Sequence, residues 1–284
     1  MNRRTTSKFS KMKTDMTTPD KINLTEEKET LFIPLCGKAM DYRSKNSILN
    51  DHTANNIIEK IDIDLSKHNR VGGRISAVRA KQYDEWTNDF MAKNKNAVIV
   101  HLGCGLDARI TRIHPPSSIN WFDVDYPEVI DLRKNFYSET NEYKMISSSI
   151  NAQNWLEKIP SCRPVLIIAE GVFEYLSKEE VATLLERLTS YFPHGQIAFD
   201  VMSSSSISSR KEKLKETTGA INKWAVDDIN EVDQLNAKLK RIETVPLFKS
   251  VFTRKLPLYY RFIIGLLTLF PQYKNAMRLL RFDF

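Results

Sequence analysis

Two glycines and two acidic residues, each directly after a run of apolar residues, are the groups in this sequence best placed to do chemistry. Gly103 and Gly105 follow the β-branched run 97–102 and are separated by one cysteine. Glycine adopts positive φ easily and lets a ligand approach the backbone without a Cβ in the way. A strand that ends in such a turn is typical of loops that bind nucleotide-containing cofactors. A tight turn without a ligand is the simpler alternative.

Asp125 stands twenty residues after Gly105, at the end of a second strand-like run, 121–125. An acidic side chain at this distance can accept hydrogen bonds from a ribose diol. Asp123 lies two residues earlier, and we expect one of these two acids to be a solvated charge at the strand end. The strand, the glycine turn and the spaced acid together indicate a nucleoside-containing cofactor.

Glu170 follows the apolar run 165–169, which we expect to be fully buried. An unpaired carboxylate at such a position costs free energy, and a ligand ammonium would satisfy it. S-adenosylmethionine carries no phosphate. It needs an acceptor for its ribose diol, a cationic partner for its carboxylate and an acceptor for its ammonium. Asp125, a basic residue and Glu170 would supply these three.

The same glycine loop also fits a dinucleotide. The segment 103–108 has the form Gly-x-Gly-x-x-Ala, which satisfies the pattern used for dinucleotides. A nicotinamide-dependent oxidoreductase is therefore the alternative. Two features count against it, because Asp107 puts a negative charge beside a pyrophosphate and because a long helical region precedes the loop. Asp107 equally fits the N-cap of the next helix.

Other chemistries find less support in the sequence. His101 and Cys104 are spaced like half a metal site, but no second pair completes it, so we expect a core histidine, a buried thiol and no metal. The serine run 203–209 lacks the Gly-x-Ser-x-Gly turn of hydrolases, and no phosphate-binding P-loop occurs. Nucleic-acid N-methyltransferases often carry an Asn/Asp-Pro-Pro-aromatic motif after the strand that corresponds to the run 165–169. Here the chain reads Glu170-Gly-Val-Phe instead, which counts against that class of enzyme.

The elements that position these residues alternate between strands and helices. Pro127 suits a first helical turn, and Ser177 with Glu180 forms a capping box that opens another helix. This alternation predicts an α/β fold with a parallel sheet and helices on both faces. The predicted strands are 97–102, 121–125, 145–149, 165–169 and 196–201, with two later ones around 239–245 and 279–284.

The chain divides into four regions by pattern. We expect a disordered basic tail at 1–20, a helical cap at 21–95, a Rossmann-like cofactor-binding core at 96–202, and lid helices with final strands of the same domain at 203–284. The serine-rich stretch 203–209 predicts a mobile loop. The apolar stretch 258–270 is too short to span a bilayer and predicts a buried helix or a lid helix.

Composition narrows the classes of partner. The net charge is +7 over 284 residues, but five basic residues lie in the first thirteen positions, so the excess elsewhere is small. Three scattered cysteines indicate no disulfide framework and fit a reducing cytoplasm. We therefore expect a cytoplasmic protein with a small-molecule partner and with neither nucleic acid nor membrane as partner. The sequence leaves its oligomeric state open.

At this point the sequence resembles a known family, the leucine carboxyl methyltransferases and the polyketide-synthesis O-methyltransferases of the tetracenomycin type. The resemblance covers roughly 24–199 and implies a Rossmann-like S-adenosylmethionine-dependent methyltransferase fold, with an N-terminal helical cap and a C-terminal lid or insertion. It is carried by five segments in the family's order, which are 28–35, 76–84, the Gly103 loop, 123–129 and 169–176.

The resemblance also implies roles for single residues. Arg79 matches the arginine that binds the methionine carboxylate, and Lys38 stands where the family has a second basic residue. Gly103 would lie beside the cofactor, Asp125 would bind the ribose, and Glu170 would lie near the methionine ammonium. Many members carry an aspartate near the adenine, shortly before a tryptophan, and here either Asn151 or Gln153 stands in its place.

The implied reaction is an in-line displacement at the sulfonium methyl by an oxygen of the substrate. A carboxylate acceptor is ionised at neutral pH and needs no general base. A phenolic acceptor would need one, and the sequence offers Tyr83, Asp200 and His68 as candidates. A protein C-terminal carboxyl methyltransferase, or a binding module that keeps the fold without catalysis, stays open as a further alternative.

Overall fold

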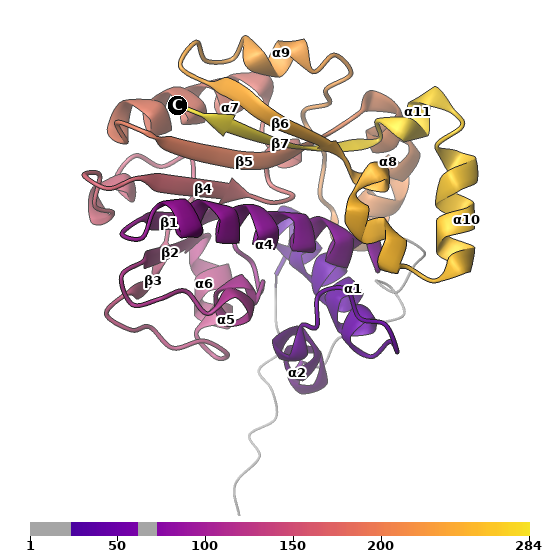
Figure 1. Cartoon of the computed structure of the whole chain (residues 1–284), viewed down its shortest axis with the longest axis horizontal. Coiled ribbons are helices and arrows are strands. Elements are labelled where there is room, and N and C mark those ends of the chain that lie inside the picture. Colours follow the sequence, from indigo (N-terminus) through magenta and orange to yellow (C-terminus); the bar gives the residue numbers. More distant parts are fainter. Residues whose placement is uncertain (1–23, 62–72) are drawn as a thin grey trace, which may run out of the picture.

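A computed structural model describes residues 24–61 and 73–284, and within them seven strands form one sheet of order β3-β2-β1-β4-β5-β7-β6 (Figure 1). β1 to β5 are parallel, and β7 is antiparallel to both of its neighbours. The predicted α/β class is therefore confirmed. The strands are β1 Val98–Leu102, β2 Asn120–Asp125, β3 Tyr143–Ser147, β4 Val165–Ala169, β5 Gly195–Met202, β6 Lys240–Pro246 and β7 Met277–Asp283.

The central strands are buried on both faces, as continuous apolar runs predict. Every residue of β1 and β4 is buried. Alternate side chains belong to two apolar clusters on opposite faces of the sheet, with Ile99 in one and Val100 in the other. The first cluster includes side chains of α4 (Ile75–Lys93) and α6 (Pro127–Arg133), and the second includes those of α7 (Lys178–Tyr191). The sheet is thus the middle of three layers.

The helix starts that the sequence predicts are present. Pro127 opens α6. Ser177 caps α7 through the full capping box, in which Ser177 Oγ accepts from the Glu180 backbone at 3.2 Å and Glu180 Oε2 accepts from the Ser177 backbone at 2.7 Å. The third strand begins and ends two residues earlier than predicted. The other short elements between the strands are α5 Arg109–Ile113, η2 Leu156–Lys158 and η3 Phe173–Tyr175.

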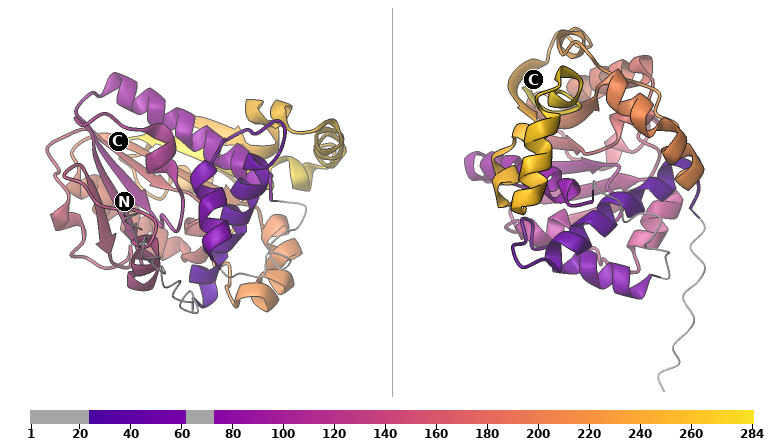
Figure 2. Two further views of the ribbon diagram at one scale, coloured as in Figure 1. Left: turned by 90° about the horizontal axis from the view of Figure 1, so that it is seen from below. Right: turned by 90° about the vertical axis from the view of Figure 1, so that its right-hand side faces the viewer.

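The described N-terminal elements are all helical; α4 runs along one face of the sheet, and the elements before it lie toward the carboxyl ends of the parallel strands (Figure 2). α1 packs on both α2 and α4, and its buried residues include Phe32, Leu35 and Lys38. This packing brings η1 and α1 to the edge of the sheet where the glycine loop lies. The elements are η1 Glu26–Leu31, α1 Phe32–Tyr42, α2 His52–Lys60 and α4. The tail predicted at 1–20 lies outside the described residues.

The C-terminal region corrects two expectations. The serine-rich stretch forms the first turns of α8, Ser204–Thr218, and is no loop. Ser203 caps this helix by accepting a hydrogen bond from the Ser206 backbone at 3.3 Å, and a polar helix can follow such a cap. The apolar stretch forms α10, Leu258–Leu267, but none of its residues is buried, so the buried-helix alternative is wrong. The remaining elements are α9 Asn230–Asp233, η4 Leu247–Lys249, η5 Val251–Lys255 and α11 Pro271–Lys274.

No helix in residues 24–61 and 73–284 has both the length and the apolar character needed to cross a membrane.

Candidate functional site

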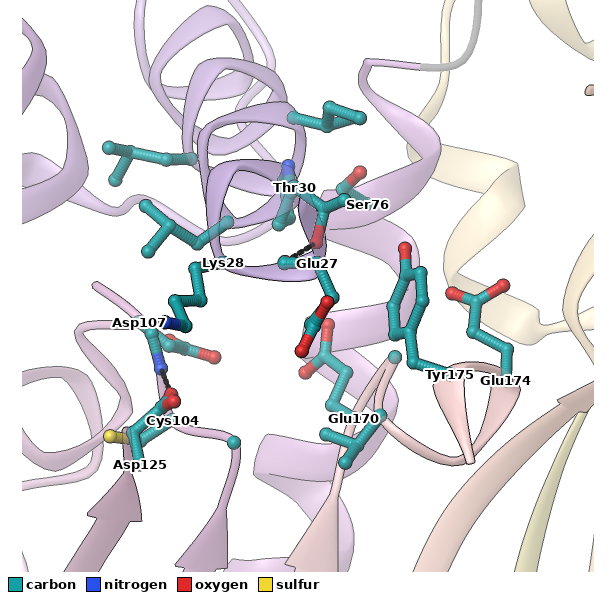
Figure 3. A pocket seen from close by; sticks show the side chains of 18 of the residues that line it. Glu27, Lys28, Thr30, Ser76, Cys104, Asp107, Asp125, Glu170, Glu174 and Tyr175 are labelled. Atoms are coloured by element: carbon teal, nitrogen blue, oxygen red, sulfur yellow. Dashed lines mark hydrogen bonds between the residues drawn. The ribbon is translucent and has the colours of Figure 1, made fainter. Parts of the chain in front are cut away.

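A cavity of about 460 Å³ opens at the carboxyl ends of β1, β2 and β4, between the sheet, η1, α1 and α8. Its volume lies in the range of small-molecule sites. Figure 3 shows Asp125 on one side of it, Glu170 in the middle, and Tyr175 and Glu174 on the other side. The seven residues that the sequence assigns to a cofactor all line this cavity, namely Lys38, Arg79, Gly103, Gly105, Asp125, Asn151 and Glu170.

The glycine loop after β1 has a backbone that other residues would not tolerate. Gly103 has φ +59° and Gly105 has φ +50°, both in the left-handed region. A Cβ on Gly103 would lie 2.5 Å from Val172 Cγ2, so the turn after β4 approaches this glycine without a gap. The loop therefore presents bare backbone to the cavity, as a closely bound cofactor requires.

Asp125 faces the cavity and is held by the backbone. Its Oδ2 accepts from the Gly105 N–H at 2.8 Å, and its Oδ1 accepts from the Tyr126 N–H at 2.7 Å. Burial raises the pKa of Asp125 to about 6, although both backbone donors act to lower it. The carboxylate therefore has a fixed orientation and an uncompensated charge, and hydrogen-bond donors from a ligand would stabilise it.

Asp123 has a different environment, and neither acid is the solvated strand-end charge that the sequence led us to expect. Asp123 is fully buried beneath the loop. Its Oδ2 lies 2.6 Å from Arg133 Nη2 and accepts from the Tyr143 hydroxyl at 2.6 Å. Burial acts to raise the pKa of Asp123, but Arg133 and His101 lower it to about 2. This ion pair is part of the folded core, and of the two acids only Asp125 lines the cavity.

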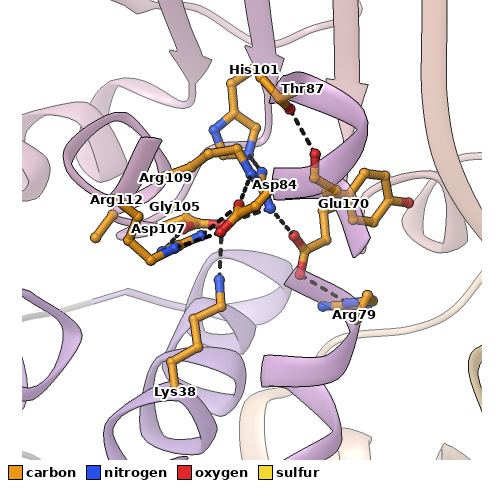
Figure 4. A network of polar contacts seen from close by, with 12 residues as sticks. Lys38, Arg79, Asp84, Thr87, His101, Gly105, Asp107, Arg109, Arg112 and Glu170 are labelled. Carbon is orange, nitrogen blue, oxygen red and sulfur yellow. Dashed lines mark hydrogen bonds and ion pairs between the residues drawn. The ribbon is translucent and has the colours of Figure 1, made fainter. Parts of the chain in front are cut away.

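Glu170, for which the sequence suggests a ligand ammonium as partner, is already paired within the protein. Its Oε1 accepts from Arg79 Nε at 2.9 Å, and its Oε2 accepts from Arg109 Nη2 at 2.5 Å (Figure 4). Burial acts to raise the pKa of Glu170, but Lys38, Arg79 and Arg109 lower it to about 2. Arg109 is fully buried, and its part in this network was not foreseen from the sequence.

Lys38 and Asp107 belong to the same network of polar contacts. Lys38 Nζ lies 2.9 Å from Asp107 Oδ2, and Arg112 Nη1 donates to Asp107 Oδ1 at 2.8 Å. Asp107 is therefore no N-cap, because α5 starts after Ala108 without a side-chain cap. Since three cations, Lys38, Arg112 and Arg109, compensate Asp107, its charge is also a weaker argument against a dinucleotide than the sequence suggests.

Arg79 lies between Glu170, which follows β4, and Asp200, which lies within β5. Besides Glu170, it contacts Asp200, with Nη1 donating to Oδ2 at 3.3 Å. A Cβ on Gly171, which has φ +68°, would come within 3.1 Å of the guanidinium, so this glycine lets Arg79 pack against the turn. The guanidinium is thereby held at the wall of the cavity.

Neither Tyr83 nor Asp200, the two candidate bases within the described residues, lines the cavity. The Tyr83 hydroxyl donates to Asp200 Oδ1 at 3.0 Å, and both side chains are buried behind Arg79 without lining the cavity. Their contacts orient Arg79. His68 lies outside the described residues. Of the two residues that the resemblance places near the adenine, Asn151 lines the cavity and donates to Glu180 Oε1 at 3.1 Å, whereas Gln153 does not line it.

Glu174 lines the far side of the cavity. It belongs to the segment 169–176, which carries the family resemblance, but the sequence suggests no role for it. Glu174 lies on η3 and is buried, and burial raises its pKa. Its Oε2 accepts from Arg210 Nη2 at 3.0 Å and from Asn222 Nδ2 at 3.0 Å. Arg210 comes from α8, so the helix that follows β5 forms this wall. Its neighbours in the wall include Lys213, Leu214, Lys223, Leu247 and Met277.

His101 and Cys104 are buried at the loop, as a core histidine and a buried thiol would be. His101 Nε2 lies 3.1 Å from Arg109 Nη1, and burial lowers the histidine pKa, so the ring is neutral at pH 7. Burial raises the pKa of the Cys104 thiol well above its usual value. Within the described residues, no group of three or more His, Cys, Asp or Glu side chains could hold a metal ion.

A glycine turn after β1, Asp125 at the end of β2, and Glu170 after β4, paired with Arg79 of α4, line one cavity, as the cofactor residues of an S-adenosylmethionine-dependent methyltransferase would. Sequence comparison identifies the family. A family model of leucine carboxyl methyltransferases matches residues 32–189. The tetracenomycin polyketide synthesis O-methyltransferase of Streptomyces glaucescens is 33% identical over 266 residues, which cover 93% of this chain and 98% of that protein. The chain belongs to the leucine carboxyl methyltransferase family.

Two further relatives carry names of the same activity. An S-adenosyl-L-methionine-dependent methyltransferase of Gibberella zeae is 32% identical over 238 residues, which cover 75% of this chain and 80% of that protein. A putative S-adenosyl-L-methionine-dependent methyltransferase of Mycobacterium avium is 25% identical over 224 residues, or 66% of this chain and 70% of its own length. The protein is an S-adenosylmethionine-dependent O-methyltransferase, and the nicotinamide alternative finds no support.

Proposed function

We propose that this enzyme methylates a carboxylate oxygen of a small molecule that binds between Glu170 and α8. The observation that carries the proposal is the set of cations on the α8 side of the cavity. Arg210, Lys213 and Lys223 line it there. Arg210 pairs with Glu174 and Lys223 lies 4.0 Å from Glu180, so the three cations exceed these two acids by one. Cations at one wall attract an anionic acceptor and hold its charged oxygen in place. The same cavity of about 460 Å³ would also hold the cofactor, so the space left suits a small acceptor.

The contacts support the following roles for the residues on the cofactor side. Asp125 would accept from the ribose hydroxyls, and the bare backbone at Gly103 would lie beside the cofactor. Arg79 would pair with the methionine carboxylate, with Lys38 adding positive charge nearby. Glu170, which Arg79 and Arg109 keep ionised, would accept from the methionine ammonium. The residues present therefore fit S-adenosylmethionine.

The bound cofactor supplies an activated methyl group, which leaves sulfur as a new carbon–oxygen bond forms to the acceptor. The protein needs to do little else than hold the acceptor in line. A carboxylate is ionised at neutral pH, so no side chain has to remove a proton. Positioning of this kind can contribute roughly 7–11 kcal/mol in favourable cases. Arg210, fixed by Glu174, would set the position of the acceptor oxygen.

A phenolic hydroxyl is the second candidate acceptor, and one observation favours it. Glu174 is a buried carboxylate that lines the cavity, and its raised pKa makes it a better proton acceptor than an exposed glutamate. It could take the proton of a phenol as the methyl group is transferred. Glu174 therefore replaces Tyr83 and Asp200 as the candidate base.

Methyl transfer to matched pairs of aromatic carboxylic acids and phenols tests the proposal. For carboxylates, Arg210→Ala should raise KM about tenfold or more, since a charged hydrogen bond is lost, and should leave the affinity for S-adenosylmethionine unchanged. Lys178→Ala is the matched control, because Lys178 pairs with Glu231 outside the cavity. Turnover of phenols alone, lost in Glu174→Gln, would favour the second candidate. An unchanged KM in Arg210→Ala would contradict the proposed acceptor site.

A further inference from the structure

The surface around α10 is apolar and uncovered. Among the described residues, eleven large apolar side chains are exposed, and nine of them lie between residues 251 and 273. Leu258, Phe262 and Leu269 are the most exposed, at 77%, 68% and 75%. Figure 1 shows α10 at the outer edge of the molecule, beyond β6 and β7. A patch of this kind on a folded protein marks a surface that something else covers.

The charges of residues 244–282 indicate the kind of partner that covers this surface. No acidic residue occurs between Glu243 and Asp283, while seven basic residues do. Exposed apolar side chains are therefore combined with a purely positive field. The five exposed cations are Lys249, Arg254, Lys255, Arg261 and Lys274.

We propose, against the sequence-based expectation of no membrane partner, that residues 249–274, which we call the α10 surface, bind an anionic lipid bilayer from one side. Helices that lie in the membrane interface combine Phe and Leu on one face with Lys and Arg beside them, and they bind anionic lipid most strongly. Tyr259 and Tyr273 are exposed in the same segment, and tyrosine is enriched at the membrane–water interface. α10 has only ten residues, so it lies on the bilayer and does not cross it.

A second copy of the chain fits this surface less well. A twofold contact uses the same patch on both copies, so two sets of five cations would meet without an acidic residue of the segment to compensate them. Phosphate groups of acidic lipids supply the missing negative charge. The surface also adjoins the active site, because Leu247 and Met277, which flank the segment, line the cavity. Docking would therefore place the cavity beside the lipid headgroups.

Co-sedimentation of the full-length protein with vesicles tests the proposal. The protein should bind vesicles of phosphatidylcholine mixed with phosphatidylserine, and should bind pure phosphatidylcholine much more weakly. Phe262→Gln/Leu269→Gln should abolish binding while keeping the fold, since neither side chain is buried. The matched control is Ile221→Gln/Ile242→Gln, which changes two exposed apolar residues elsewhere and should bind like the unsubstituted protein.

A second pair of variants tests the charge. Arg261→Glu/Lys274→Glu should weaken binding to the mixed vesicles by at least about 25-fold, since each cation near such a surface contributes about fivefold. Lys93→Glu/Lys95→Glu makes the same change in charge at the end of α4 and should have little effect.

Three outcomes would overturn the proposal. The first is vesicle binding that neither α10 pair reduces, which would point to another part of the chain, such as the basic residues of the first thirteen positions. The second is the absence of vesicle binding. The third is a concentration-dependent dimer that Phe262→Gln/Leu269→Gln abolishes while lipid has no effect, and this result would assign the surface to a second copy.

Discussion

Lowering the pH from about 8 to about 5 should weaken S-adenosylmethionine binding about tenfold, through the protonation of Asp125. The carboxyl is buried, and its pKa lies at about 6 in the empty cavity. Above this pH the carboxylate is charged and can accept from the ribose hydroxyls. Below it, one oxygen carries a proton and becomes a donor, so the site loses an acceptor.

The magnitude follows from the pKa. If only the ionised form binds, about one molecule in eleven is competent at a pH one unit below the pKa, and the apparent Kd rises about elevenfold. Asp125→Asn should bind about tenfold more weakly at pH 8, because a charge-assisted hydrogen bond is lost, and its affinity should no longer depend on Asp125 ionisation. Glu170 should not contribute, because its pKa is about 2.

Isothermal titration calorimetry over this pH range measures the effect. Any titration of the ligand or of Glu174 is shared by the unsubstituted protein and Asp125→Asn, so the difference between the two curves belongs to Asp125. Asp131→Asn is the control, since Asp131 is 72% exposed on α6 and should leave the profile unchanged. Parallel profiles for the unsubstituted protein and Asp125→Asn would refute the ribose role of this residue.

Three further substitutions separate binding from folding. Asp123→Asn should lower the free energy of unfolding by roughly 3–5 kcal/mol in urea titrations, because it leaves Arg133 buried without its charge partner; a loss of cofactor affinity at unchanged stability would contradict this assignment. Arg79→Ala should raise the Kd of S-adenosylmethionine and of S-adenosylhomocysteine alike, and Arg79→Lys should rescue it only in part, as calorimetry can show; equal affinity in all forms would remove Arg79 from the site. Gly103→Ala should destabilise the fold by about 1–3 kcal/mol, because its φ is +59° and its Cβ would meet Val172. Adding Val172→Ala should relieve this clash but not the backbone strain of the positive φ. Full recovery of the thermal midpoint in the double variant would show that the backbone strain is absent.

Stability should also fall in acid, and the sign of the effect at Asp123 can be worked out. Its pKa is about 2 in the folded protein, against 3.8 for an exposed aspartate. A lowered pKa stabilises the fold above about pH 4, and this contribution, about 2–3 kcal/mol, is lost as the pH falls from about 4 to about 2. Asp123→Asn should remove this part of the pH dependence.

The sheet could be predicted because local patterns dictate it. Short apolar runs rich in β-branched residues, such as 165–169, favour buried strands when they alternate with helical segments, and the capping box at Ser177 carries its own hydrogen bonds. The candidate cofactor residues could also be predicted from the sequence, because the carboxyl ends of parallel strands meet at one edge of the sheet. Gly103, Asp125 and Glu170 end three such strands and line one cavity.

The ion pairs could not be predicted, because their partners are far apart in the sequence. Glu170 pairs with Arg79 and Arg109, which precede it by 91 and 61 residues. The residues next to Glu170 in the sequence do not show that its carboxylate is already paired with two arginines. The serine run 203–209 was misinterpreted because serine suits both a loop and a helix N-cap, and only the residues after it decide between them.

The exposure of α10 shows the same limit. An amphipathic or apolar stretch predicts that something will cover it, but the sequence does not say whether the cover is the protein's own core. The structure shows that the protein's own core does not cover α10, since none of its residues is buried.

A crystal structure of the complex with S-adenosylhomocysteine tests the central claim most directly. The ligand should lie in the cavity between β1, β2 and β4, with both ribose hydroxyls hydrogen-bonded to Asp125 and the methionine carboxylate paired with Arg79. Its sulfur should face the wall formed by Glu174 and Arg210. A ligand bound outside this cavity, or one whose ribose makes no contact with Asp125, would contradict the account.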